Sequence, residues 1–188
     1  MDEIKSGSEN FIKIGNEKFV PLITESEIKK RVEELGKKIS DDYRYKLPIF
    51  IGVLNGSFMF LADLLKHVDI HCEMDFFKLS SYGDSKISSG NVKMLKELNA
   101  DINERHVIIV EDIVDTGNTI VALVNQLSAY NPKDIKIATL LFKPEAYTKN
   151  IKIDYIALEV PNKFLVGYGL DYDGLGRNLE SIYSLASD

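Results

Sequence analysis

The sequence predicts an α/β domain built on a mostly parallel, twisted sheet with helices on both faces. Short apolar runs typical of buried strands alternate along the chain with segments of helical periodicity. In two places a strand passes through a tight polar turn directly into a helix, at residues 55–57 and 111–118. Because parallel strands are joined by right-handed crossovers, this alternation indicates a sheet covered on both sides.

The expected elements follow one another without a repeat or a long linker. The first helix spans residues 24–40, where apolar side chains recur at helical spacing and Thr24 with Glu27 forms a capping-box pattern. The others are a strand at 48–54, a helix at 58–68, strands at 70–79 and 107–110, a helix at about 119–130, and strands at 135–141 and 155–158. Ligands of such sheets bind beyond the carboxyl ends of the strands, which makes the two turns the strongest functional candidates.

Length and composition indicate one globular domain. The chain has 188 residues, of which 45% are hydrophobic and 28% charged, with a formal net charge of −6. A single cysteine, Cys72, excludes an intramolecular disulfide, and the N-terminus lacks a secretory pattern, so we expect a reducing cytoplasm. No apolar stretch approaches the roughly 20 residues that span a bilayer, and the negative charge argues against general affinity for nucleic acid or membranes.

The turn at residues 115–119 has the composition of an anion site. A helix N-terminus offers unpaired N–H groups and a positive dipole end, so this turn can encircle a phosphate with backbone donors and threonine hydroxyls. A structural alternative carries about the same weight: Asp115 or Thr116 is only an N-cap, and Gly117 only a turn residue.

Two adjacent carboxylates, Glu111 and Asp112, stand just before this turn, at the end of the buried strand. Unpaired charge in such a place is costly, so the two side chains require a cation, hydroxyl donors or water. Magnesium together with a diol would satisfy both carboxylates, since hard oxygen ligands suit magnesium.

Residues 107–119, VIIVEDIVDTGNT, resemble the thirteen-residue phosphoribosyl-pyrophosphate (PRPP) motif of the purine and pyrimidine phosphoribosyltransferases. Nearly the whole chain is similar to one branch of that family, the hypoxanthine-guanine enzymes. The other matching segments are Leu54-Asn55-Gly56-Ser57, Ser80-Ser81-Tyr82-Gly83, Leu141-Phe142-Lys143-Pro144 and residues 163–172, KFLVGYGLDY. The resemblance implies a type I phosphoribosyltransferase fold in a single domain, 1–188, with a core at about 24–150 and a small hood formed by about 1–23 and 151–188.

The resemblance also implies roles within the thirteen-residue motif. Glu111 and Asp112 would hold the 2- and 3-hydroxyls of the ribose and, directly or through water, a magnesium ion. The 5-phosphate would lie in the turn formed by Asp115, Thr116, Gly117, Asn118 and Thr119. Asp115 would in addition face the purine N7 and act as the general base while the N-glycosidic bond forms.

Pyrophosphate contacts are implied at Asn55, Gly56, Ser81, Tyr82 and Arg177. Asn55 stands where many relatives carry lysine or arginine, so the backbone rather than a cationic side chain would serve there. Ser81 and Tyr82 would belong to a lid over residues 81–91 that excludes water from the cation-like ribose. On sequence alone, 55–57 is also a common turn and 81–91 a surface hairpin.

Purine contacts are implied at Lys143, Phe164, Leu165 and Asp171. Lys143 would donate to the 6-oxo group, Phe164 would stack on the base, the backbone near Leu165 would bond its Watson–Crick edge, and Asp171 would help hold a second magnesium. Without the resemblance, Lys143 would be a solvated surface lysine and Phe164 a core residue. His67, His71, His106 and Cys72 show no metal-ligand spacing and are expected outside the site.

The expected function is purine salvage: transfer of the 5-phosphoribosyl group from PRPP to N9 of hypoxanthine, with guanine as a second base, giving IMP or GMP and pyrophosphate. Mg2+ is the implied cofactor. PRPP, hypoxanthine and guanine are the implied partners, without nucleic acid or membrane, in a homodimer or homotetramer. Two alternatives remain: a non-catalytic PRPP-binding regulator, which would carry a DNA-binding segment and a basic face, or a related enzyme that prefers xanthine.

Overall fold

The computed structural model describes residues 11–80, 93–96 and 98–186. Its strands are β1 (Ile12–Ile14), β2 (Glu17–Ile23), β3 (Ile49–Leu54), β4 (Glu73–Ser80), β5 (Lys93–Lys96), β6 (His106–Val114), β7 (Asp134–Phe142), β8 (Tyr155–Glu159), β9 (Leu165–Val166) and β10 (Ile182–Leu185). Its helices are α1 (Glu25–Asp42), α2 (Phe58–Lys66) and α3 (Asn118–Ser128). None of the helices in these ranges is long and apolar enough to cross a membrane.

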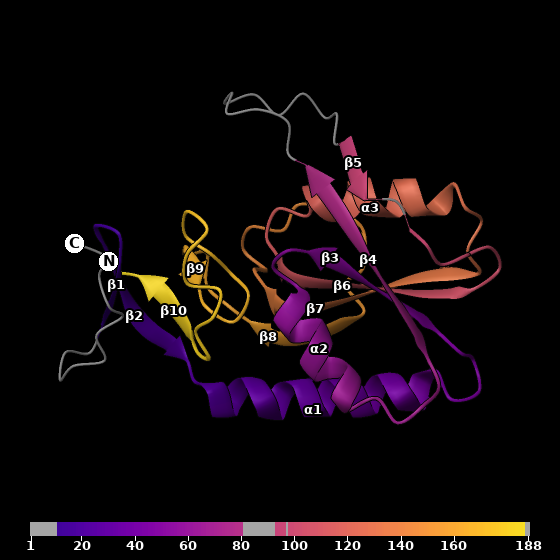
Figure 1. Cartoon of the computed structure of the whole chain (residues 1–188), viewed down its shortest axis with the longest axis horizontal. Helices are drawn as coiled ribbons and strands as arrows, with labels where there is room; N and C mark the ends of the chain where they lie inside the picture. Colours follow the sequence, from indigo (N-terminus) through magenta and orange to yellow (C-terminus); the bar gives the residue numbers. More distant parts are fainter. Residues whose placement is uncertain (1–10, 81–92, 97, 187–188) are drawn as a thin grey trace.

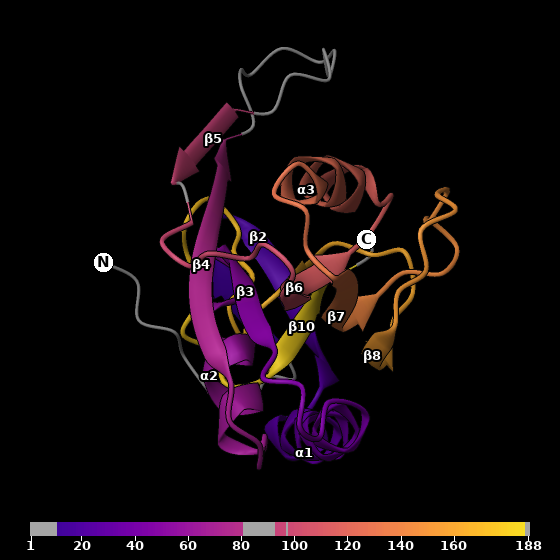
Figure 2. The same ribbon diagram turned by 90° about the vertical axis from the view of Figure 1, so that its right-hand side faces the viewer.

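The larger of two sheets has six strands in the order β5-β4-β3-β6-β7-β8. The ladders from β4 to β8 are parallel, and only the edge strand β5 runs antiparallel to its neighbour. The helices α1 and α2 cover one face of this sheet, and α3 covers the other (Figures 1 and 2). The predicted α/β class, with a mostly parallel sheet flanked by helices, is confirmed.

Alternating side chains of the central strands supply the two halves of the core. Phe50 and Ile108 point to the side of α1 and α2, whereas Ile49 and Ile109 point to the side of α3, and all four are completely buried. This period of two is what a sheet buried on both faces requires, and it explains the continuous apolar runs.

Local signals in the sequence account for how the helices of one layer begin and meet. Thr24 caps α1 as predicted, its hydroxyl accepting a hydrogen bond from the backbone N–H of Glu27. Where α1 crosses the end of α2, a Cβ at Gly36 would lie 2.7 Å from the Cβ of His67, so only glycine allows this approach. The two helices therefore pack closely beneath β3 and β6.

A smaller sheet, the hood, has four strands in the order β1-β2-β10-β9 and lies at one end of the larger sheet (Figure 1). Its core consists of Ile12, Ile14, Phe19 and Val166. The expected hood boundary at residue 151 needs a correction, because β8 pairs with β7 in the larger sheet. The C-terminal part of the hood therefore begins only at β9.

The strand β6 is longer than predicted. Its ladder with β7 continues past Val110, with Glu111 opposite Thr139 and Val114 opposite Phe142. The segment 111–114, expected in a turn, is therefore strand, and the acidic pair lies on a rigid element rather than in a loop. The starting residue of β4 is also later than predicted, 73 instead of 70.

Candidate active site

Backbone segments from three elements meet at the carboxyl ends of β3 and β6. The Leu54–Asn55 peptide bond, at the end of β3, is cis. A Cβ at Gly56 would lie 1.7 Å from Oδ2 of Asp112, and a Cβ at Gly169, in the hood, would lie 2.1 Å from the carbonyl oxygen of Gly56. Side chains at either glycine would thus collide with the opposite segment. The loop after β3, the end of β6 and the turn after β9 at residues 167–170, the hood turn, form one contiguous surface, the floor of the candidate site.

The acidic pair is placed on this floor by β6. Glu111 is 6% exposed, and burial together with the neighbouring Asp112 raises its pKa well above the usual range. Burial raises the pKa of Asp112 to about 6, against the lowering effect of the Ile113 N–H and of Arg177. The Ile113 N–H donates to Oδ1 of Asp112 at 2.9 Å. Both carboxylates would gain from a cation or from hydroxyl donors, as the sequence predicts.

Asp115 and Lys143 form an ion pair next to the acidic pair. Nζ of Lys143 lies 2.7 Å from Oδ2 of Asp115, and the lysine side chain is 8% exposed while the aspartate is 44% exposed. The backbone N–H of Lys143 also donates to the Val114 carbonyl at 3.0 Å, which continues the β6–β7 ladder. Lys143 is therefore buried, and the alternative of a solvated surface lysine is wrong.

The turn between β6 and α3 leaves the first N–H groups of α3 without a side-chain cap. Its N-cap residue is Gly117, with φ 84 and no side-chain cap hydrogen bond. The alternative that Asp115 or Thr116 caps the helix is wrong, since Gly117 occupies the N-cap position and the Asp115 carboxylate pairs with Lys143. A Cβ at Gly117 would lie 2.4 Å from the ring of Tyr147, so the turn is narrow as well as uncapped. Such a helix start can bind an anion.

The hood brings a second acidic group to the same floor. Nη2 of Arg177 lies 2.6 Å from Oδ1 of Asp171, while the Gly174 N–H donates to Oδ2 of Asp171 at 2.8 Å. Asp171 and Arg177 both act on the pKa of Asp112, the first raising and the second lowering it. The predicted groups on β6 and in the hood are thus close enough to influence one another electrostatically.

Phe164 and Leu165 mark the start of β9. Phe164 is 47% exposed, so the alternative of a core phenylalanine is wrong, while Leu165 is 5% exposed. The ring of Tyr172 contacts that of Phe164 edge-on at 5.8 Å between centroids and also contacts Phe19 at 5.7 Å. Phe164 is therefore supported by the ring of Tyr172 while about half of its surface stays exposed.

Not every predicted site residue can be placed. Ser81 and Tyr82 lie outside the described residues. Among the residues that the structure describes, no three His, Cys, Asp or Glu side chains form a group that could hold a metal ion. Glu111, Asp112 and Asp171 therefore do not form a ready cage by themselves.

Two tyrosines near the site have no role assigned from the sequence. Tyr147 closes over Gly117, and Tyr172 supports Phe164. The only signal for either was its place in the chain, a few residues after Lys143 and next to Asp171. His106, set aside in the sequence, indeed lies at the opposite end of β6, where its Nδ1 is 2.7 Å from Asp134.

Comparison with known proteins places this geometry in a family. The family described as "Phosphoribosyl transferase domain" matches residues 23–173. A hypoxanthine-guanine phosphoribosyltransferase of Bacillus subtilis is 48% identical over 161 residues, which cover 86% of this chain and 89% of the relative. The chain belongs to the hypoxanthine-guanine branch of the phosphoribosyltransferase family.

Further relatives agree with this placement. The hypoxanthine-guanine phosphoribosyltransferase of Streptococcus thermophilus is 45% identical, over 84% of this chain and 88% of the relative. A crystal structure of the Bacillus anthracis hypoxanthine-guanine phosphoribosyltransferase superimposes with a TM-score of 0.84 at 38% identity, covering 88% of this chain and 98% of that one. The type I phosphoribosyltransferase fold expected from the sequence is thereby confirmed.

Proposed function

We propose that the protein transfers the 5-phosphoribosyl group of PRPP to N9 of hypoxanthine, and also of guanine, with release of pyrophosphate. The observation that carries this proposal is the ion pair between the buried Lys143 and the partly exposed Asp115, beside the acidic pair on β6. The ion pair offers a proton acceptor and a cationic donor about one hydrogen bond apart, as a 6-oxopurine requires. The names of the relatives from B. subtilis and S. thermophilus support the same choice of base.

The ribose phosphate would be bound by groups of opposite character. Glu111 and Asp112 accept hydrogen bonds from the ribose hydroxyls, which relieves two carboxylates that burial holds in an unfavourable state. The uncapped N–H groups of the turn, with the hydroxyls of Thr116 and Thr119, receive the 5-phosphate. An acidic protein can bind this anion because fixed backbone dipoles, rather than net charge, supply the donors.

The chemical step would be a displacement at C1 of the ribose. The bond between C1 and pyrophosphate breaks, its electron pair leaves with pyrophosphate, and N9 of the purine forms the new bond to a strongly cationic C1. Asp115 accepts the proton from N7 of the purine at the same time. Lys143 turns from Asp115 to the 6-oxo group, which a 6-amino group cannot replace because it offers no acceptor there.

Magnesium fits the groups at this site, and we propose it as the cofactor. Two adjacent carboxylates with raised pKa values, of which Glu111 is buried, are suited to a hard cation, and an ion that arrives with PRPP and keeps its waters needs no complete protein cage. Glu111 and Asp112 would hold it, with Asp171 at a second ion. When bound, magnesium would neutralise negative charge on the departing pyrophosphate.

The remaining contacts are proposed from the family resemblance and the local geometry. Pyrophosphate would bind the backbone of Asn55 and Gly56, together with Arg177 and, beyond the described residues, Ser81 and Tyr82. Phe164 would stack on the purine from its aromatic support. We further propose, from the resemblance alone, a homodimer or homotetramer that acts in the cytoplasm on small molecules.

A parallel spectrophotometric assay tests the proposal. PRPP is offered with hypoxanthine, guanine, xanthine or adenine, and we expect turnover with hypoxanthine and guanine and none with adenine. Activity restricted to xanthine would contradict the proposed base preference. If no base is converted while calorimetry still shows binding of PRPP, the alternative of a PRPP-binding regulator would be favoured.

A further inference from the structure

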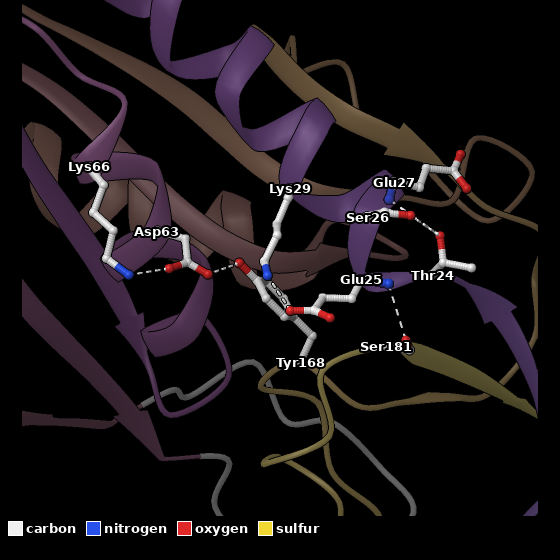
Figure 3. A network of polar contacts seen from close by, with 9 residues as sticks. All are labelled: Thr24, Glu25, Ser26, Glu27, Lys29, Asp63, Lys66, Tyr168 and Ser181. Atoms are coloured by element: carbon white, nitrogen blue, oxygen red, sulfur yellow. Dashed lines mark hydrogen bonds and ion pairs between the residues drawn. The ribbon is translucent and has the colours of Figure 1, made fainter.

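A hydrogen bond between Tyr168 and Asp63 joins the hood to the core behind the site (Figure 3). The hydroxyl of Tyr168 donates to Oδ2 of Asp63 at 2.5 Å, and the tyrosine is only 3% exposed. Tyr168 lies in the short turn after β9, and Asp63 lies on α2, 105 residues apart in the chain. No purine or ribose contact in the proposed function uses either side chain.

The bond lies directly behind the contact of Gly169 with Gly56. Tyr168 precedes Gly169, whose tight fit against the Gly56 carbonyl leaves no space for a Cβ. Asp63 is on the helix that begins at Phe58, two residues after Gly56. The bond therefore connects the supports of the two loops that meet at the pyrophosphate side of the proposed site.

The position of Gly169 in the hood turn also determines the positions of two charged residues, Arg177 and Asp171. The Gly169 N–H donates to the Arg177 carbonyl at 2.9 Å, and Nη1 of Arg177 donates to the Gly169 carbonyl at 2.7 Å. Arg177 in turn holds Asp171 at 2.6 Å. Because these bonds tie Arg177 to Gly169 at both its backbone and its side chain, a displaced Gly169 displaces Arg177 and Asp171 as well.

Both partners are in the protonation states that the bond requires. Burial raises the pKa of Tyr168 far above its ordinary value, so the phenol keeps its proton. Burial also acts to raise the pKa of Asp63, but the hydrogen bonds from Lys66 and Tyr168 outweigh it and leave the pKa below its ordinary value. At neutral pH a neutral donor therefore faces an ionised acceptor, the stronger kind of hydrogen bond.

We propose that Tyr168 and Asp63 are a positioning pair that holds Arg177 and Asp171 in place for the pyrophosphate group of PRPP. The inference rests on the proposed function, since it concerns the same site. A second tie restrains the same segment of the hood: the backbone N–H of Glu25 donates to Oγ of Ser181 at 3.1 Å (Figure 3). The Glu25–Ser181 bond keeps the hood attached when the Tyr168 hydroxyl is removed. Loss of the Tyr168 hydroxyl should therefore misplace the turn around Gly169 without unfolding the protein.

The test compares Tyr168→Phe with the wild-type protein in steady-state kinetics and in calorimetric titration with magnesium and PRPP. We expect KM and Kd for PRPP to rise on the order of tenfold, with KM for hypoxanthine changed less than about twofold. Asp63→Ala should have the same effect, and Asp63→Asn, which keeps an acceptor oxygen, should stay within about threefold of wild type. The double variant Tyr168→Phe/Asp63→Ala should be no worse than Asp63→Ala.

The chain offers two matched controls. The hydroxyl of Tyr155 donates to Oδ2 of Asp42 at 2.9 Å, a tyrosine–aspartate bond between β8 and α1. Tyr155→Phe should lower Tm and leave KM for PRPP unchanged. Lys66→Met removes the exposed partner of Asp63, 2.6 Å away, without touching Tyr168, and should leave KM for PRPP unchanged as well.

The outcomes separate the pair from the proposed function. A lower Tm with KM and Kd for PRPP within twofold of wild type in Tyr168→Phe would reduce the bond to a structural contact. Should Tyr168→Phe fail to fold, equal PRPP affinity in Asp63→Ala and Asp63→Asn would overturn the inference. Wild-type protein without transfer to any base would refute the proposed function instead, and its calorimetric Kd for PRPP would still test the pair.

Discussion

Asp115 is paired with Lys143 in the candidate site and is still accessible to a ligand. Its carboxylate is held by a buried lysine, yet the side chain itself remains 44% exposed, so it can reach both Lys143 and a ligand. A plain helix cap would point its oxygen at N–H groups of α3, whereas Gly117 takes the cap position here. Asp115 therefore does not cap α3, and its carboxylate is available for proton transfer.

Replacing Asp115 with asparagine should lower kcat on the order of 10²-fold or more, because the amide cannot accept the N7 proton in the transition state. Affinity for PRPP should stay close to wild type, since the proposed contacts of the turn with phosphate are made by its backbone. Steady-state kinetics with calorimetric PRPP titration measure both quantities. A fall in kcat of less than about threefold would remove Asp115 from the role of general base.

Lys143→Met, which keeps the length of the side chain without its charge, should reduce the use of 6-oxopurines. We expect kcat/KM for hypoxanthine to fall on the order of 10²-fold, because the buried donor proposed for the 6-oxo group is lost. Competition between hypoxanthine and adenine in one reaction measures the base preference. Lys133→Met, a change distant from the site, is the control, and an unchanged preference in Lys143→Met would leave the lysine with a purely structural role.

At the scale of elements, the strand β6 combines stability with function. The same ladder that buries Val110 continues into Glu111 and Asp112 and fixes both carboxylates without a loop. That rigidity has a cost in the unliganded protein, since burial raises the pKa of each carboxyl group. Ligand hydroxyls or a cation would offset this cost, which is a known trade between stability and activity.

Asp112→Asn should therefore stabilise the unliganded protein above pH 6. The Asp112 carboxyl ionises near 3.8 in the unfolded chain and at about 6 in the folded one, so the folded state holds the extra proton between these values. Stability then falls as pH rises through this window, and the loss persists above it, about 3 kcal/mol at most. Urea unfolding without PRPP or magnesium should show a gain at pH 8 that vanishes at pH 4.

Asp41→Asn, a change at an exposed aspartate, should show no comparable gain and serves as the control. A pH-independent effect of Asp112→Asn would mean that the carboxylate is not destabilised by its burial.

Sequence patterns predicted the elements whose signal is local. The apolar runs of β3 and β7 and the capped start of α1 follow from periodicity and composition, and they were placed within one or two residues. The continuation of β6 was missed because Glu111 and Asp112 are polar, and polar residues at a strand end are indistinguishable from a turn. Only the neighbouring strand β7 decides the matter.

Contacts between distant segments were beyond any local signal. The approach of Gly56 to Asp112 and Gly169 depends on the crossing of three elements, and the bond of Tyr168 to Asp63 spans 105 residues. The family resemblance identified Asp171 and Arg177 as candidates, but not their ion pair or their attachment to Gly169. Sequence thus indicated which residues to examine, and the fold indicates how they are held.

For the whole molecule, the two sheets divide the work of the proposed reaction. The larger sheet carries the acidic pair, the phosphate turn and the ion pair of Asp115 on its carboxyl edge, while the hood carries Phe164 and Asp171. A ligand that touches both sheets would connect them, so binding and hood position should be coupled. The site is complete only where hood and core meet.

The same arrangement explains why removal of magnesium should abolish activity. The chain carries a formal net charge of −6, and buried carboxylates stand beside the proposed place of a substrate that is itself a polyanion. Arg177, already engaged by Asp171, is one cation against this excess of negative charge, so a metal that arrives with PRPP must balance the remainder. Turnover of hypoxanthine should stop in excess EDTA and return when magnesium exceeds the chelator, with EDTA presaturated by magnesium as the control. Full turnover in excess EDTA would mean that the backbone donors and Arg177 alone stabilise the leaving pyrophosphate.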